Sequence, residues 1–268
     1  MTQTQNSADS EAAPVSNLGD QTSTQLSAVL PPEVIAENIA QVQAQIALAA
    51  KRAQRNPAEV QLMLAAKYQP AENLRSAIAA GAKLFGHNLV QQLATAESEI
   101  VNLPHTTTMI GHVQSNKLTT AMQYASRIDT VDSLKTAERI SRRQSARINA
   151  GEASGAFPIL LQVNSSGAPS QFGCTPNSLI ELAKRILELP NLQIQGLMTI
   201  GANTPDRAAV VESFQITQEL SAQLRELPSL SQADVLSMGM TADLELAVEH
   251  GSTLVRVGRA VFGQRPQK

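Results

Sequence analysis

Lys67 is the residue of this sequence best suited to covalent chemistry with a carbonyl group. It directly follows the apolar run LMLAA at residues 62–66, which predicts a buried strand. An amine at the end of such a strand either extends to solvent or takes part in a functional site at that end of the strand. Partial burial lowers a lysine pKa toward the neutral amine that forms a Schiff base with a carbonyl. Lys67 is therefore a candidate Schiff-base residue, although a solvated strand-end lysine would occupy the same position.

Two turns near the C-terminus have the composition of a phosphate site. SMGMT, residues 237–241, leads into a helix for which Thr241 is a candidate N-cap, and RVGR, residues 256–259, ends another strand. Turns of this kind expose backbone N–H groups that can bind a phosphate. The Ser237 hydroxyl adds a donor if it faces the same side. Each turn alone also fits an ordinary loop with a helix cap.

The elements that must position these residues are strands and helices in regular alternation. An amphipathic helix opens at Pro31-Pro32, and eight strand-like runs follow, each with a helical stretch after it. The runs cover residues 60–66, 83–86, 106–110, 126–131, 158–163, 192–200, 235–237 and 253–257. This order indicates parallel strands with right-handed crossovers, and eight units indicate a closed (β/α)8 or TIM barrel.

In such a barrel, Lys67 and both turns would lie together at the carboxyl ends of the strands. Active sites form at this end, and the loops after strands seven and eight commonly bind phosphate. An open, doubly wound sheet is the alternative fold, but no G-x-G-x-x-G motif follows the first strand.

Composition limits the other classes of function. The polar residues 1–29 predict a disordered tail, and residues 30–268 predict one barrel domain. A net charge of −2, 3% aromatic residues and no Trp argue against a nucleic-acid partner. The single cysteine, Cys174, and four unclustered histidines predict no metal site. With no apolar run long enough for a membrane span and no secretory signal, we expect a cytoplasmic protein and a monomer.

Six motifs in this order resemble those of the pyridoxal phosphate homeostasis proteins, whose barrel is similar to the N-terminal domain of alanine racemase. The resemblance runs from about Glu33 to Arg265. The motifs are LAAKYQP around Lys67, FGHNLVQ around Asn88, IGHVQSNK at 110–117, GLMTI at 196–200, SMGMTADLELAVEHGS at 237–252 and LVRVGRAVFG at 254–263.

The resemblance implies a fold-type III barrel that binds pyridoxal 5′-phosphate (PLP). Lys67 would hold PLP as a Schiff base, and Arg256 would project to the pyridine nitrogen. Asn88 would lie near the ring or its hydroxyl, and the remaining residues would surround the phosphate. The implied cofactor-binding residues are Lys67, Asn88, Ser237, Gly239, Arg256, Gly258 and Arg259, the last two mainly through backbone N–H groups.

The sequence departs from the family pattern at three places. His87 replaces a glutamate, and we assign it no acid–base role. Thr107 and Thr108 replace an aromatic-His pair, and Gln171-Phe172-Gly173 replaces a Lys-x-Gly loop. These changes alter the charge expected at the mouth of the barrel but leave Lys67 and both turns intact.

Two classes of function follow from the resemblance. The predicted class is a non-catalytic PLP carrier or regulator, acting in vitamin B6 homeostasis and on amino- and keto-acid pools, which would bind PLP and amino acids. The alternative is a PLP-dependent racemase or decarboxylase of the same fold. A third alternative is another phosphate-binding barrel enzyme in which Lys67 serves a different carbonyl. We assign no catalytic residue.

Two observations favour the carrier. Racemisation needs proton donors on both faces of the substrate, and alanine racemases take one of them, a tyrosine, from an added β-domain. We expect no such domain because the eighth strand is close to the end of the sequence, which contains Tyr68 and Tyr124 as its tyrosines. Arg256 cannot accept the proton of the pyridine nitrogen, so PLP would be a weak electron sink. Racemases of this fold also use an arginine there, so this second observation does not exclude racemisation.

Overall fold

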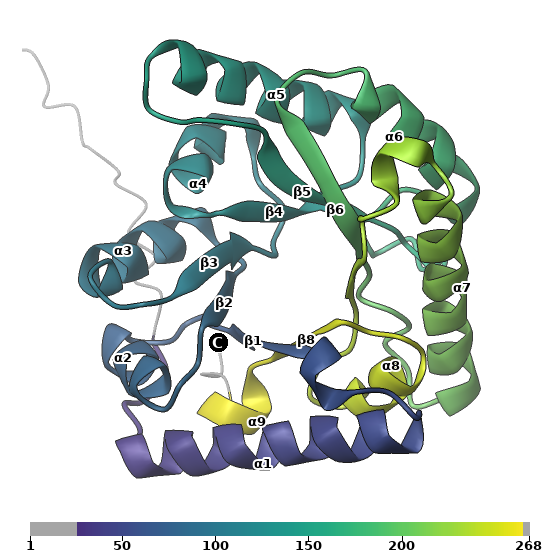
Figure 1. Ribbon diagram of the computed structural model, residues 1–268. Helices are drawn as coiled ribbons and strands as arrows, with labels where there is room; N and C mark the ends of the chain where they lie inside the picture. Colours follow the sequence, from purple (N-terminus) through teal and green to yellow (C-terminus); the bar gives the residue numbers. More distant parts are fainter. Residues whose placement is uncertain (1–25, 265–268) are drawn as a thin grey trace, which may run out of the picture.

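The eight strands form one closed parallel barrel in sequence order (Figure 1). The computed structural model describes residues 26–264. Strand β1 pairs with β2 on one side and with β8 on the other, so that Gln61 lies opposite Leu254 and Leu64 opposite Val257. This closure confirms the predicted (β/α)8 barrel and excludes the open, doubly wound sheet.

Helices surround the barrel and alternate with its strands (Figure 1). The strands are β1 (Gln61–Ala65), β2 (Leu84–His87), β3 (Thr106–Met109), β4 (Arg127–Val131), β5 (Phe157–Gln162), β6 (Leu192–Met198), β7 (Val235–Ser237) and β8 (Leu254–Val257). The helices are α1 (Pro32–Arg52), α2 (Ala71–Ala79), α3 (Val90–Ile100), α4 (Leu118–Tyr124), α5 (Leu134–Asn149), α6 (Leu179–Leu187), α7 (Arg207–Arg225), α8 (Leu244–Glu249) and α9 (Arg259–Phe262).

Helix α1 lies across the region where the first and last units of the barrel meet. Proline at its first position fits a helix start, because the missing N–H would have no intrahelical acceptor there. Its buried face, with Ile35 and Ile39 at helical spacing, packs in one apolar cluster with Leu64 and Val255. Helix α1 contacts α2, α8 and α9 and thereby covers this side of the barrel (Figure 1). Truncating Ile35 to Ala would cost about 2–5 kcal/mol.

Side chains alternate between the barrel interior and the helix layer along each strand. In β1, Leu64 belongs to the helix-facing cluster, whereas Met63 and Ala65 point to the other side. Lys67 lies two residues beyond Ala65, in the turn that follows β1. The turn therefore places residue 67 at the carboxyl end of the barrel strands.

Four residues of the predicted tail, 26–29, belong to the part of the chain that the structure describes. Ser27 N–H donates to the carbonyl of Tyr68 at 2.8 Å, and the Asn73 amide donates to the carbonyl of Ala28 at 3.0 Å. Composition does not reveal these contacts because residues 27 and 28 make them through the backbone. The rest of the predicted tail, residues 1–25, lies outside the described residues. None of the helices within residues 26–264 is long and apolar enough to cross a membrane.

Candidate functional site

A cavity of about 500 Å³ opens at the carboxyl ends of the strands. This is the end of a (β/α)8 barrel at which active sites form. Four residues predicted from the sequence line it, namely Asn88, Arg256, Gly258 and Arg259. The other lining residues are Ala65, Ile110, Met198, Ile200, Ala202, Asn203, Met240, Thr241, Ala242, Asp243 and Gln264. We call this space the mouth cavity.

Arg256 forms the buried polar base of the mouth cavity. It belongs to β8 and is 5% exposed. Its guanidinium donates from Nη1 to the Ser237 hydroxyl and from Nη2 to the Thr199 carbonyl, each at 2.8 Å. Burial lowers the pKa of Arg256, while the carboxylates of Asp129 and Asp243 oppose that shift. An arginine so held remains a cation and a fixed donor.

The turn after β7 is held by backbone geometry. Gly239 has a φ of 92°, a conformation that glycine adopts at little cost, and its carbonyl accepts from Arg256 N–H at 2.9 Å. A Cβ at residue 239 would lie 2.4 Å from the Cβ of Ala247, so no side chain fits. Thr241 was the predicted N-cap, but Asp243 occupies the cap position of α8. The Asp243 carboxylate instead accepts from Met240 N–H at 2.5 Å, and burial raises the pKa of this carboxyl.

The turn after β8 brings backbone directly to the cavity. Gly258 precedes α9, and its carbonyl accepts from the N–H groups of Val261 and Phe262 at 3.1 and 2.9 Å. The first N–H groups of a helix have no intrahelical acceptor, so those of Arg259 and its neighbour are available to an anion. A Cβ at Gly258 would lie 3.2 Å from the carbonyl oxygen of Ala65, which shows how closely this turn approaches the end of β1.

Asn88 reaches the cavity from the residue after β2. Its backbone is in close contact with Gly111, where a Cβ would lie 2.1 Å from the Asn88 carbonyl oxygen. This contact fixes the position of Asn88 beside Ile110, and both residues line the cavity. The predicted placement of Asn88 at the mouth is therefore consistent with its position in the structure.

Lys67 lies at the rim, and its amine contacts an aromatic ring. The side chain is partly buried, and Nζ lies 4.9 Å from the ring centroid of Tyr68. Tyr68 has a φ of 65°, an uncommon value for a non-glycine residue, and its N–H donates to Gln92 Oε1 at 3.1 Å. Within the described part of the chain, the mouth cavity is lined by Ala65 but not by Lys67. In this rotamer the amine is beside the cavity and directed to Tyr68.

The structure thus separates the predicted site residues into three groups, one of which is Lys67 alone, with its amine directed to Tyr68. Asn88, Arg256, Gly258 and Arg259 line the cavity. Ser237 and Gly239 do not line the cavity but contact Arg256. The Ser237 hydroxyl accepts from the Arg256 guanidinium, and the Gly239 carbonyl accepts from the Arg256 backbone N–H. Thr199 and Asp243 were not predicted as site residues. Thr199 ends the GLMTI motif, which was the one signal that could have indicated it.

The residues at which the sequence departs from the family pattern do not line the mouth cavity. They lie in β2 and β3 or form contacts between loops. Thr107 is buried and donates to Glu97 Oε1 at 2.6 Å, and Thr108 faces the barrel interior. Gln171 donates to the carbonyl of Gly201 at 2.9 Å and so ties together the loops after β5 and β6. Neither threonine lines the mouth cavity, and Thr108 lines a different cavity at the opposite end of the barrel.

His87 is buried without a hydrogen-bond partner. Neither ring nitrogen has an acceptor or donor among residues 26–264, and the side chain is 1% exposed. Burial lowers the pKa of His87 to about 4, with a smaller contribution from His105. The imidazole of His87 is therefore neutral and enclosed, which agrees with the prediction that His87 has no acid–base role.

Comparison with known proteins agrees with this geometry. The alanine racemase N-terminal domain model matches residues 35–266. A pyridoxal phosphate homeostasis protein of Pseudomonas aeruginosa is 41% identical over 231 residues, which is 86% of this chain and 96% of that protein. The Escherichia coli K12 protein of the same name is 34% identical over 235 residues, 86% of this chain and 97% of that protein.

This chain belongs to the pyridoxal phosphate homeostasis protein family. The solved structure of PipY of Synechococcus elongatus with PLP bound has a TM-score of 0.72 and 33% identity, covering 85% of this chain and all of that one. Alanine racemase of Corynebacterium glutamicum has a TM-score of 0.66 at 14% identity, covering 91% of this chain and 64% of that one. This second likeness shows a shared fold.

Proposed function

We propose that this chain holds PLP as a Schiff base on Lys67 and acts in PLP homeostasis as a carrier or regulator. The observation that carries the proposal is the fixed guanidinium of Arg256 at the base of the mouth cavity, between two glycine turns. Membership of the family, and the PLP bound in the PipY structure, support the choice of cofactor.

The residues present fit the chemical groups of PLP. When bound, PLP supplies an aldehyde that condenses with an amine and a phosphate that needs hydrogen-bond donors. The backbone at Gly258 and Arg259 lines the cavity and provides donors at a helix start, which suits the phosphate. Arg256 offers a donor to the pyridine nitrogen, and Asn88 offers an amide at the same cavity. Ser237 orients Arg256 in addition to any contact with the phosphate.

Lys67 must leave the face of Tyr68 to enter the mouth cavity. A cation–π contact at a partly exposed site contributes about 0.5–1 kcal/mol, so this rotation is accessible at room temperature. The backbone of the turn is fixed independently, because Tyr68 N–H is bound by Gln92 and Tyr68 C=O by Ser27. A fixed backbone with a movable amine suits a residue that captures and releases an aldehyde.

The tyrosines and Arg256 favour a carrier over a racemase. Tyr68 is adjacent to Lys67, and Tyr124 ends α4 and packs against the apolar core. Neither of these tyrosines is among the residues that line the mouth cavity. Arg256 already donates two hydrogen bonds and has no basic lone pair, so it would leave the pyridine nitrogen unprotonated.

The sequence also predicts amino-acid ligands and a monomeric state, and both are part of this proposal. We propose amino acids as ligands that compete for the Lys67-bound aldehyde, because a free amine exchanges with a Schiff base. We further propose that the protein acts as a monomer. Its cytoplasmic location stays a prediction.

Absorbance of the purified protein with PLP tests the proposal. We expect a band near about 420 nm that is lost in Lys67→Ala and retained in the control Lys117→Ala. A band of unchanged intensity in Lys67→Ala would refute the assignment. Turnover of a panel of amino acids by the loaded protein, well above that of free PLP, would favour the racemase or decarboxylase alternative.

A further inference from the structure

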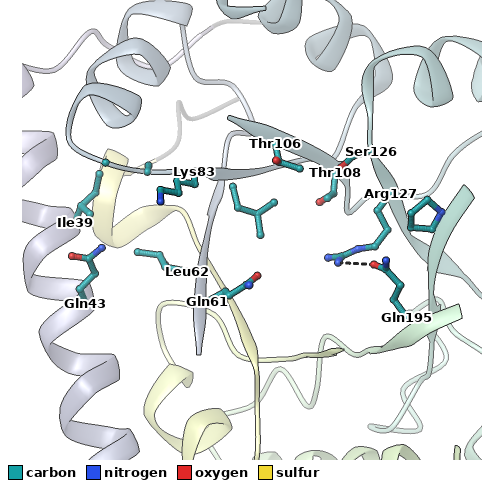
Figure 2. A pocket seen from close by; sticks show the side chains of 14 residues that line it. Ile39, Gln43, Gln61, Leu62, Lys83, Thr106, Thr108, Ser126, Arg127 and Gln195 are labelled. Carbon is teal, nitrogen blue, oxygen red and sulfur yellow. Dashed lines mark hydrogen bonds between the residues drawn. The ribbon is translucent and has the colours of Figure 1, made fainter. Parts of the chain in front are cut away.

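A second cavity, of about 570 Å³, lies at the amino ends of the strands, on the face opposite the mouth cavity. Residues at or next to the first positions of successive strands line it, including Gln61 of β1, Thr106 of β3 and Arg127 of β4. Ile39 and Gln43 of α1 form one wall (Figure 2). We call this space the amino-end cavity. Neither the proposed function nor the family motifs involve it.

The amino-end cavity is lined by cations, amides and hydroxyls. Lys83 and Arg127 supply the positive charges, and among the residues 26–264 that line it none is an aspartate or glutamate. The neutral polar lining residues are Gln43, Gln61, Thr106, Thr108, Ser126 and Gln195. All of these can donate hydrogen bonds. A cavity with this lining is suited to an anionic ligand.

Arg127 is fixed with one donor group left for a ligand. Its Nε and Nη2 donate to the two carboxylate oxygens of Asp129 at 2.6 and 3.0 Å, and Asp129 is fully buried. Its Nη1 is directed to Gln195 Oε1 at 3.4 Å, a long and weak hydrogen bond (Figure 2). The ion pair therefore positions the guanidinium, and Nη1 can exchange its amide partner for a carboxylate.

Lys83 supplies a second cation on the other side of the cavity. It immediately precedes β2, is exposed, and forms no ion pair within the described residues. Its carbonyl accepts from Thr106 N–H, and Thr108 lies opposite Arg127, so β3 runs between the two cationic residues. Their backbones are two strand spacings apart across the sheet and about three residues apart along β3, which together give a separation of about 14 Å. Figure 2 shows Lys83 and Arg127 on opposite sides of the space.

We propose that the amino-end cavity binds a small aliphatic dicarboxylate. One carboxylate pairs with Arg127 and Gln195, and the other pairs with Lys83. The chain between them lies against Leu62 and Ile39, which are apolar residues of the lining. Asp129 already balances the charge of Arg127, so Arg127 acts through its remaining Nη1 donor and Lys83, unpaired among residues 26–264, acts as the cation. Because these two groups lie on opposite sides of the cavity, a ligand with an anionic group at each end can meet both, whereas a monocarboxylate or a single phosphate can meet only one of them closely.

Calorimetric titration with glutarate tests this site, with succinate as a shorter dicarboxylate and glutaramide as the neutral match. The informative variant is Gln195→Glu, which places a carboxylate beside Arg127 and keeps the Arg127–Asp129 pair. Lys83→Gln removes the second cation from an exposed position. Gln232→Glu makes the same charge change as Gln195→Glu at an exposed residue that lines a neighbouring cavity and not this one.

We expect saturable glutarate binding that weakens about tenfold or more in Gln195→Glu and in Lys83→Gln, and by less than about twofold in Gln232→Glu. Glutaramide should give no saturable heat. Absence of dicarboxylate binding, or binding that both cavity variants leave unchanged, would overturn the inference, as would equal binding of valerate or inorganic phosphate. The titration does not require PLP, so its failure is distinct from failure of the proposed cofactor function, which the absorbance band reports.

Discussion

The guanidinium of Arg256 donates to the hydroxyl of Ser237 at 2.8 Å, and this hydrogen bond joins β8 to β7 beneath the mouth cavity. Because both residues are 5% exposed or less, the contact is made in a region of low dielectric, where a charge-assisted hydrogen bond is strong. The position of the cation is thus set by the protein before any ligand arrives.

Replacing Arg256 tests this preorganisation. Arg256→Gln removes the charge and leaves the Ser237 hydroxyl and the Thr199 carbonyl without their donor. We expect a loss of about 2–4 kcal/mol in the free energy of unfolding and a PLP affinity at least about tenfold lower. Ser237→Ala should cost about 1 kcal/mol. Denaturant unfolding and PLP titration measure both quantities, and unchanged PLP affinity in Arg256→Gln would contradict the proposed role.

The glycine of the turn after β7 gives a second prediction. Gly239→Ala must place a Cβ against Ala247 and keep a φ of 92°, so overpacking and backbone strain act together. We expect a loss of about 3 kcal/mol in the free energy of unfolding and weaker PLP binding. The matched control is Gly155→Ala, where φ is 72° and nothing lies within 4 Å of the added Cβ. Equal losses in the two variants would show that the contact with Ala247 has no effect.

The buried imidazole of His87 predicts a dependence of stability on pH. Its pKa is about 4 in the folded chain, below the ordinary histidine value of about 6.5. Between these values the unfolded chain binds more protons, so the free energy of unfolding falls as pH decreases from about 6.5 to 4, by up to about 1.4 kcal/mol per pH unit. Above about pH 6.5 this contribution is constant.

A variant can separate this effect from general acid denaturation. His87→Gln should reduce the slope of stability against pH in that range, because it removes the buried imidazole. Urea unfolding at several pH values gives the slope. A wild-type slope that persists in His87→Gln would mean that other groups determine it.

The fold could be predicted because short strand-like runs, most of them apolar, alternate regularly with helical stretches along the sequence. The position of Lys67 followed from the strand that precedes it, and the two glycine turns followed from local composition. All three depend on residues that are neighbours in the sequence. Such features can be recognised without knowledge of long-range contacts.

The remaining features depend on contacts between distant segments. The Arg256–Thr199 hydrogen bond spans 57 residues, and the hydrogen bond from Leu30 N–H to Asn73 spans 43. The rotamer that places the Lys67 amine on Tyr68 depends on the turn geometry, which Gln92 of α3 helps to fix. No sequence pattern indicated the amino-end cavity, because its lining residues come in small groups from α1 and six strands or their flanking loops.

Borohydride reduction of the PLP-loaded protein, followed by peptide mass mapping, tests the central claim most directly. Reduction converts a lysine Schiff base into a stable secondary amine, so the modified residue can be identified. The account predicts a single phosphopyridoxyl group on the peptide that contains Lys67, and none on that peptide in Lys67→Ala. A modification located mainly on another lysine, or no modification at saturating PLP, would contradict it.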